Sequence, residues 1–325
     1  MTVSMKRHIA AAALAGLLSS GAATASEPYP AKPVRLVVPF TPGSASDILA
    51  RSISQRLSAR WGQPVVVDNR PGAGGTIGTG LVAKARPDGY TLVVVSAGHI
   101  VNPLLYANLP YDTLKDFRGV TPLANLPSVL AVSKELRLSS VRELIALAKA
   151  KPGELNYVSG GIGSGSHINA EKFRLATGVA TVHVPMKGAT DMLTELMSGR
   201  AQYGFLPIVA AVSIAREGRI GTLAVSSEHR SPTLPDVPTI AEAGVPGAQF
   251  DFWVGVLAPA ATPRDIVHKL QRDMSDALKL KDVVTQLAQL GAEPMPMTPE
   301  AFDAFIRKEF QTLGPLLKTA GIKAQ

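Results

Sequence analysis

Short runs rich in β-branched residues alternate with longer helical patterns along most of this chain, and no other sequence feature limits the fold as strongly. The runs lie at residues 34–40, 64–68, 90–96, 155–159, 181–185, 202–205 and 223–226. A parallel strand is buried on both faces and needs a crossover helix to reach its neighbour, so this alternation predicts parallel sheets covered by helices. The predicted fold class is therefore α/β.

The helical patterns show which faces are buried. Leu49 and three further apolar residues follow one another at intervals of four, which predicts a helix from Asp47 that packs on a sheet. Ser46 precedes this helix and is a suitable N-cap. Another helix is predicted over residues 263–280.

The predicted strands and helices are too many for a single five-stranded sheet, so we expect two lobes. Residues 119–133 and 250–259 are extended and interrupted by Pro, and we interpret them as two crossings between the lobes. The first lobe would then comprise residues 27–128 plus 250–325, and the second lobe residues 129–249.

The N-terminus has the three parts of a secretory signal peptide. Lys6 and Arg7 precede an apolar run over residues 9–18, and small residues end at Ala25. We expect residues 1–25 to be removed and the product to be periplasmic. The chain has no Cys, so it has neither a disulfide nor the Cys to which bacterial lipoproteins attach their lipid.

Turns rich in small residues follow several predicted strands, and they are the candidate ligand site. Ligands of α/β sheets bind beyond the carboxyl ends of the strands, where helix N-termini direct free N–H groups outward. Such groups suit an anion, and a carboxylate is favoured over phosphate because no G-x-x-x-x-G-K motif occurs. The candidate ligand-binding residues in these turns are Phe40, Thr41, Gly43, Ser44, Ala45, Ser46, Asp47, Ser96, Ala97, His99, Ser159, Gly161, Gly163, Ser164, Ser166 and His167.

The sequence lacks the motifs that are typical of several other functions. The formal net charge of +8 comes from scattered basic residues, so we expect no nucleic-acid partner. A hydrolase elbow, G-x-S-x-G, is missing because Ile162 occupies the first Gly position nearest to Ser164. The six His are isolated and no H-E-x-x-H pair exists, so we expect neither a metal site nor a cofactor.

Ordered motifs along the mature chain resemble one family. They include Val37-Val38-Pro39-Phe40, Asn69-Arg70-Pro71-Gly72-Ala73-Gly74-Gly75, Pro87-Asp88-Gly89-Tyr90-Thr91-Leu92, Leu109-Pro110-Tyr111-Asp112, Val182-His183-Val184-Pro185 and Leu234-Pro235-Asp236-Val237-Pro238-Thr239. In these motifs the chain resembles receptors of the tripartite tricarboxylate transporter family, also called Bug receptors. The resemblance implies a type II periplasmic-binding-protein fold, with two α/β lobes and a ligand cleft between them.

The resemblance also implies a function without catalysis. Such receptors capture a small organic carboxylate for a membrane permease, and they hold it with the turns that correspond here to residues 40–47 and 159–167. We expect a monomer. A periplasmic sensor for a signalling partner is the alternative, and a secreted hydrolase is a weaker one.

The chain departs from the family pattern where polar side chains are common. Leu206-Pro207 replaces a common Asp-Asn, and Met186 replaces a common Tyr before Lys187. We therefore add Met186 and Leu206 to the candidate ligand-binding residues and predict a ligand with one carboxylate and an apolar or aromatic body. We expect Lys187 to face solvent.

Overall fold

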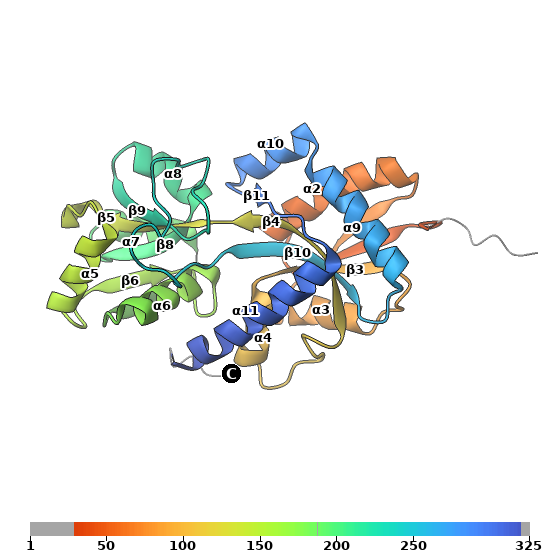
Figure 1. The fold of residues 1–325 in the computed structure, drawn as a ribbon, viewed down its shortest axis with the longest axis horizontal. Helices are drawn as coiled ribbons and strands as arrows, with labels where there is room; N and C mark the ends of the chain where they lie inside the picture. Colours follow the sequence, from red (N-terminus) through yellow and green to blue (C-terminus); the bar gives the residue numbers. More distant parts are fainter. Residues whose placement is uncertain (1–28, 187, 320–325) are drawn as a thin grey trace, which may run out of the picture. The chain divides into compact units, whose positions relative to one another are not determined.

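The computed structural model describes residues 29–186 and 188–319, which form two β-sheets with helices packed on them (Figure 1). The first sheet has the order β11-β4-β10-β3-β1-β2. Its strands are β1 (Val34–Val38), β2 (Val65–Asn69), β3 (Thr91–Ser96), β4 (Phe117–Leu126), β10 (Phe252–Pro259) and β11 (Glu293–Pro294). Strand β1 pairs in parallel with β2 and with β3, whereas β10 runs antiparallel to both β3 and β4.

Six helices accompany the first sheet. They are α2 (Ala45–Trp61), α3 (Thr76–Ala83), α4 (Gly98–Leu105), α9 (Arg264–Leu278), α10 (Lys281–Gln289) and α11 (Pro299–Thr319). A short 3-10 turn, η1 (Ala73–Gly75), precedes α3. Trp253 on β10 is fully buried and packs edge-on against Phe302 and Phe305 of α11, so the C-terminal helix closes this core.

The second sheet has the order β7-β6-β8-β5-β9. Its strands are β5 (Ser128–Ser133), β6 (Asn156–Ser159), β7 (Val182–Pro185), β8 (Tyr203–Pro207) and β9 (Ile220–Val225). Its helices are α5 (Val141–Ala150), α6 (Gly165–Thr177), α7 (Ala189–Met197) and α8 (Ile208–Arg216), and the 3-10 turn η2 (Lys134–Leu136) follows β5. Tyr157, Phe173 and Tyr203 are fully buried among the aliphatic side chains of this core.

The chain crosses between the sheets twice, and the crossings are bonded to each other. Pro127 alone separates β4 from β5, and the return crossing spans residues 226–251. Ser226 donates its amide N–H to the carbonyl of Ser128 at 2.8 Å, and its hydroxyl accepts from the amide of Ser128 at 3.0 Å. The two segments that connect the lobes therefore run side by side (Figure 1).

Some elements differ from the sequence-based expectation. The predicted crossings, 119–133 and 250–259, consist mostly of the sheet strands β4, β5 and β10. The first helix begins at Ala45, and its N-cap is Ser44 rather than Ser46, because the Ser44 hydroxyl accepts from the amide of Asp47. The residue bounds given above for the two lobes remain our proposal.

Two features concern membranes and export. Within the described ranges, no helix is both long and apolar enough to cross a bilayer. The predicted signal peptide, residues 1–25, lies outside the residues that the structure describes.

Candidate ligand-binding site

A cavity of about 640 Å³ is lined by residues of both lobes. It lies where strands end and helices begin, because the first residues of α2, α4, α6 and α7, and Val209 near the start of α8, all line it. The first N–H groups of a helix have no acceptor inside that helix. Five helix N-termini therefore provide backbone donors and positive dipole ends at one cavity.

The side chains that the structure describes in this wall are uncharged. Among the described residues that line the cavity, none is Asp, Glu, Lys, Arg or His. Polar side chains are few, and they include Ser96 and Asn102 in the first lobe and Ser128, Ser164 and Ser166 in the second. Backbone N–H groups and hydroxyls, and not a basic side chain of the described wall, are the groups available to bind an anion.

The first loop, residues 40–47, leads from β1 into α2. Ser44 caps the helix, and the amide of Asp47 donates to the Ser44 hydroxyl at 3.3 Å. The Asp47 carboxylate accepts from the amide of Gly43 at 2.9 Å and from Asn69 Nδ2 at 2.9 Å. Burial raises the pKa of Asp47, but these hydrogen bonds and those from Arg51 outweigh it, so the pKa lies below its ordinary value. Asp47 is therefore ionised, and the hydrogen bond that it accepts from Gly43 stabilises the loop.

The second loop, residues 159–167, leads from β6 into α6 and has the same local structure. Ser164 caps the helix, and the amide of His167 donates to the Ser164 hydroxyl at 3.3 Å. The amide of Gly163 donates to Nδ1 of His167 at 3.1 Å, as Gly43 does to Asp47. The cap residues have φ and ψ of −65° and 158° at Ser44 and −67° and 158° at Ser164.

The two loops also match in sequence once they are aligned on their caps. Residues 43–47 read Gly-Ser-Ala-Ser-Asp, and residues 163–167 read Gly-Ser-Gly-Ser-His. Gly43 and Gly163 have positive φ angles of 82° and 76°, which glycine adopts without strain. This pair of related loops was missed in the sequence because five residues are too few to stand out as a repeat.

Aromatic stacking holds the side chain of His167, which belongs to the second loop. The His167 and His183 rings are stacked with their centroids 4.1 Å apart, and His183 is stacked on Tyr157 at 4.8 Å. Nε2 of His183 lies 2.6 Å from the hydroxyl of Ser159. Burial, and then the neighbouring His183, lower the pKa of His167 to about 4. His167 is thus neutral at physiological pH, which leaves its Nδ1 free to accept from Gly163.

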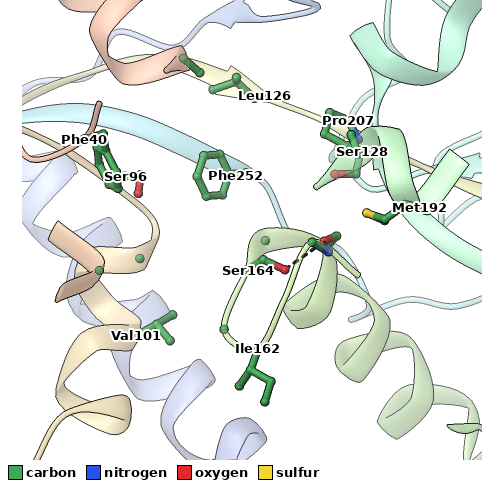
Figure 2. A pocket seen from close by; sticks show the side chains of 18 of the residues that line it. Phe40, Ser96, Val101, Leu126, Ser128, Ile162, Ser164, Met192, Pro207 and Phe252 are labelled. Carbon is green, nitrogen blue, oxygen red and sulfur yellow. Dashed lines mark hydrogen bonds between the residues drawn. The ribbon is translucent and has the colours of Figure 1, made fainter. Parts of the chain in front are cut away.

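Apolar side chains form most of the remaining wall. Phe252, the first residue of β10, lies in the middle of the cavity, with Phe40 and Ser96 on one side and Pro207 and Met192 on the other (Figure 2). A Cβ on Gly165 would lie 2.7 Å from the Phe252 ring, so this glycine lets the ring rest on the first turn of α6. An apolar ring therefore lies next to the N-terminus of α6.

The structure brings only some of the predicted site residues to the cavity wall. Those that line it are Phe40, Gly43, Ala45, Ser96, Gly163, Ser164 and Ser166. Those that do not are Thr41, Ser44, Ser46, Asp47, Ala97, His99, Ser159, Gly161, His167, Met186 and Leu206. Several of the latter shape the loops, as shown above for Ser44, Asp47 and His167. Lys187 lies outside the described residues.

Three of these residues lie in packed surroundings. His99 is buried between Tyr111 and Phe117, with ring centroids 5.8 Å and 5.3 Å away. Leu206 is fully buried in the core of the second lobe, because strand alternation turns it away from the cavity that Pro207 lines. Met186 packs on the edge of the same core.

Sequence reasoning missed other lining residues. Val101, Leu126, Ser128, Met192 and Phe252 line the cavity and lie in helices or strands rather than in the small-residue turns. Leu126, Ser128 and Phe252 had one signal, their place at a predicted crossing. Val101 and Met192 had none, because apolar residues in helices are usually core.

Two α/β lobes that are joined by two adjacent crossings and enclose a cavity lined by helix N-termini define the class of solute-binding proteins. The family described as tripartite tricarboxylate transporter family receptor matches residues 49–322. The chain belongs to this family. Its members are periplasmic solute-binding receptors, so the chain is a receptor and not an enzyme.

Three proteins illustrate the similarity. BugT of Bordetella pertussis is 37% identical over 304 residues, which cover 93% of this chain and 93% of BugT. Rpa4515 of R. palustris, solved with adipate, is 38% identical with a TM-score of 0.75, covering 91% of this chain and 100% of that one. MatC of Rhodopseudomonas palustris, solved with malate, is 34% identical with a TM-score of 0.71, covering 89% and 100%. The type II periplasmic-binding fold is thereby confirmed.

Proposed function

We propose that this receptor captures a small organic carboxylate that has an apolar, preferably aromatic, body. The observation that carries the proposal is a cavity in which helix N-termini meet a wall of uncharged, largely apolar side chains. Helix N-termini bind one carboxylate well through directed N–H groups. A second charged group in contact with the apolar part of the wall would lose its hydration without a partner, which costs about 1–3 kcal/mol or more.

The ligand contacts that we propose follow from this wall. Ala45, Gly165 and Ser166 would supply backbone donors from the first turns of α2 and α6. Phe40 and Phe252 would cover the body of the ligand, because flat apolar rings suit an aromatic or aliphatic acid. Met186 and Leu206 do not line the cavity, so Met192 and Leu126 replace them in this proposal.

Similar receptors bind dicarboxylates, which makes the second end of the ligand informative. Rpa4515 was solved with adipate, whose two carboxylates are joined by a methylene chain, and MatC with malate, a smaller and more polar acid. The apolar wall of this chain favours an acid with an adipate-like or aromatic body over one like malate.

We further propose how the receptor works in the cell. Residues 1–25 would be a signal peptide cleaved after Ala25, and the mature protein would act as a monomer. It would deliver its ligand to the membrane permease of a tripartite tricarboxylate transporter, as family membership suggests.

Isothermal titration calorimetry tests the ligand class. Benzoate-like acids should bind one to one and more tightly than citrate or aspartate. At a hundred times its dissociation constant, such a ligand should also stabilise the protein by about 2.7 kcal/mol in thermal unfolding. Tighter binding of citrate or aspartate would contradict the apolar cavity, and hits among sugars or cations alone would contradict the carboxylate.

The variant Phe252→Ala tests whether the Phe252 ring contacts the apolar body of the ligand. It should weaken binding of benzoate by about tenfold, because the ring covers the body, and change binding of acetate little. Ile77→Ala is a suitable control, since Ile77 is 58% exposed and does not line the cavity. An equal loss for both acids would instead indicate a general disturbance of α6.

A further inference from the structure

A cluster of charged side chains lies where α11 of the first lobe contacts α6 of the second. We call it the inter-lobe cluster, and it consists of Lys172 on α6, Asp251 at the end of the return crossing and Glu309 on α11. Lys172 is buried, with 8% of the residue exposed, and its ammonium lies 5.7 Å from the centroid of the Phe250 ring. Asp251 immediately precedes Phe252, which lines the cavity. The inter-lobe cluster therefore contains residues of both lobes and is joined directly to the cavity wall.

The register of the first sheet places Asp251 beside an amide side chain. Trp253 pairs with Asn125 in the ladder of β10 and β4, and Asp251 is two residues before Trp253, so it lies on the same face. Oδ1 of Asp251 and Oδ1 of Asn125 are both buried, and neither has a hydrogen-bond partner among the described residues. A proton on Asp251 would provide this pair of acceptors with a donor.

The surroundings of Asp251 also favour its protonated form. Burial raises the pKa of Asp251 to about 7, against the lowering effect of a hydrogen bond from Asn125. The carboxylates of Glu228 on the return crossing, Glu293 on β11 and Glu309 on α11 add to this increase in pKa. A negative charge on Asp251 is thus disfavoured by its burial and by three neighbouring acids.

The other two members of the cluster are also more easily held uncharged. Burial raises the pKa of Glu309 more than Lys172 and Lys308 lower it. Burial also lowers the pKa of Lys172 more than the carboxylates of Glu309 and Asp251 raise it. The cost of removing these charges from water therefore exceeds their mutual attraction.

We propose that the inter-lobe cluster binds a proton as the lobes come together, so that closure on a ligand is linked to pH. Movement of α6 away from α11 would hydrate Lys172, Asp251 and Glu309, and hydration removes the cost of their charges. The arrangement with the lobes together then binds more protons. Its added stability is complete below the ordinary pKa of an Asp and is lost as the pH rises through about 7, the pKa of Asp251. This inference rests on the proposed function, because a carboxylate is the probe of closure.

Calorimetry in two buffers with different ionisation enthalpies counts the protons that are taken up on binding. Benzoate is the probe, or adipate if benzoate does not bind. Near pH 6 the unmodified protein should take up about half a proton or more for each ligand bound, and its affinity should be at least about threefold higher at about pH 5.5 than at about pH 7.5. Asp251→Asn keeps the size of the side chain but cannot ionise, so it should lower the proton uptake by at least about half.

Asp303→Asn is the matched control. Burial also raises the pKa of Asp303 on α11, but its Oδ1 accepts from the amide of Gly119 at 2.7 Å, within the first lobe. The control should take up as many protons as the unmodified protein. Absence of proton uptake by the unmodified protein, or equal uptake by the Asp251 and Asp303 variants, would overturn the inference.

The protein without ligand provides a second test. Small-angle scattering should show a larger radius of gyration at about pH 7.5 than at about pH 5.5 for the unmodified protein, and a smaller change for Asp251→Asn. If neither acid binds, the proposed function is refuted, and the scattering comparison decides the inference alone. A radius of gyration that is the same at both pH values would then overturn it.

Discussion

Buried histidines show how single residues are specialised at positions that do not line the cavity. His99 lies among aromatic rings, and burial lowers its pKa to about 4. His167 has a similarly lowered pKa, yet its lone pair holds a loop. Both were predicted as ligand contacts from their places in small-residue turns. Their roles in the structure are packing for His99 and support of the second loop for His167.

The protonation of His99 has a measurable effect on stability. The unfolded chain binds a proton near pH 6.5, whereas folded His99 does so only near pH 4, so acidification between these values favours unfolding. His99→Phe keeps an aromatic ring beside Tyr111 and Phe117 and removes this proton. The unmodified protein should therefore lose more unfolding free energy than the variant over this range, by an amount on the order of 3 kcal/mol. Urea unfolding across the pH range measures it, and identical pH profiles would refute the assignment.

At the scale of elements, capping links stability to binding at α6. The Ser164 hydroxyl accepts from the amide of His167 and donates to the carbonyl of Gly161 at 2.7 Å. Ser164 is therefore both the last residue of the loop and the N-cap of α6. Ser140 caps α5 in the same way, accepting from the amide of Glu143 at 3.2 Å, but it does not line the cavity.

These two caps form a matched pair of variants. Ser164→Ala and Ser140→Ala should each lower the free energy of unfolding by about 1 kcal/mol, because each loses one cap hydrogen bond. Only Ser164→Ala should also weaken carboxylate binding, by several-fold, since its loop then loses its fixed shape. Chemical unfolding and calorimetry on both variants measure the two effects separately. Equal affinities for the two variants would show that the cap of α6 serves the fold alone.

For the whole molecule, two glycines let the lobes meet on either side of the cavity. A Cβ on Gly163 would lie 2.6 Å from Cδ1 of Leu105 in α4. A Cβ on Gly291, after α10, would lie 3.0 Å from the backbone nitrogen of Val209 in α8. The Leu105 side chain can rotate away, but the Val209 backbone cannot, so Gly291 is the stricter requirement for the approach of the lobes.

Replacement of Gly291 should therefore hold the lobes apart. Gly291→Asn suits the positive φ of 62°, because Asn tolerates this region better than other residues, and Gly62→Asn is the control with φ of 63° and open space around it. Gly291→Asn should bind carboxylate about tenfold more weakly than the control. Small-angle scattering should show a larger radius of gyration for the ligand-saturated variant. Equal affinity and equal scattering for both variants would rule out this role.

The sequence by itself determined the α/β class, most strand positions and the small-residue turns that contribute to the cavity. These follow from local physics: β-branched runs, helical spacing and glycine-rich turns act over a few residues. The number of predicted strands and helices also indicated two lobes, and the motif resemblance added the type II fold and the receptor role. Of the predicted loops, 40–47 and 159–167 each contribute residues to the cavity.

Only the tertiary structure decided which side chains line the cavity. Leu206 and Pro207 are neighbours on one strand, yet the former is core and the latter lines the cavity, because alternate residues point to opposite faces of a sheet. Phe252 comes from a distant crossing and reaches the site because β10 pairs between β3 and β4. Such contacts depend on residues far apart in the chain, and the spacing of residues along a sequence does not encode them.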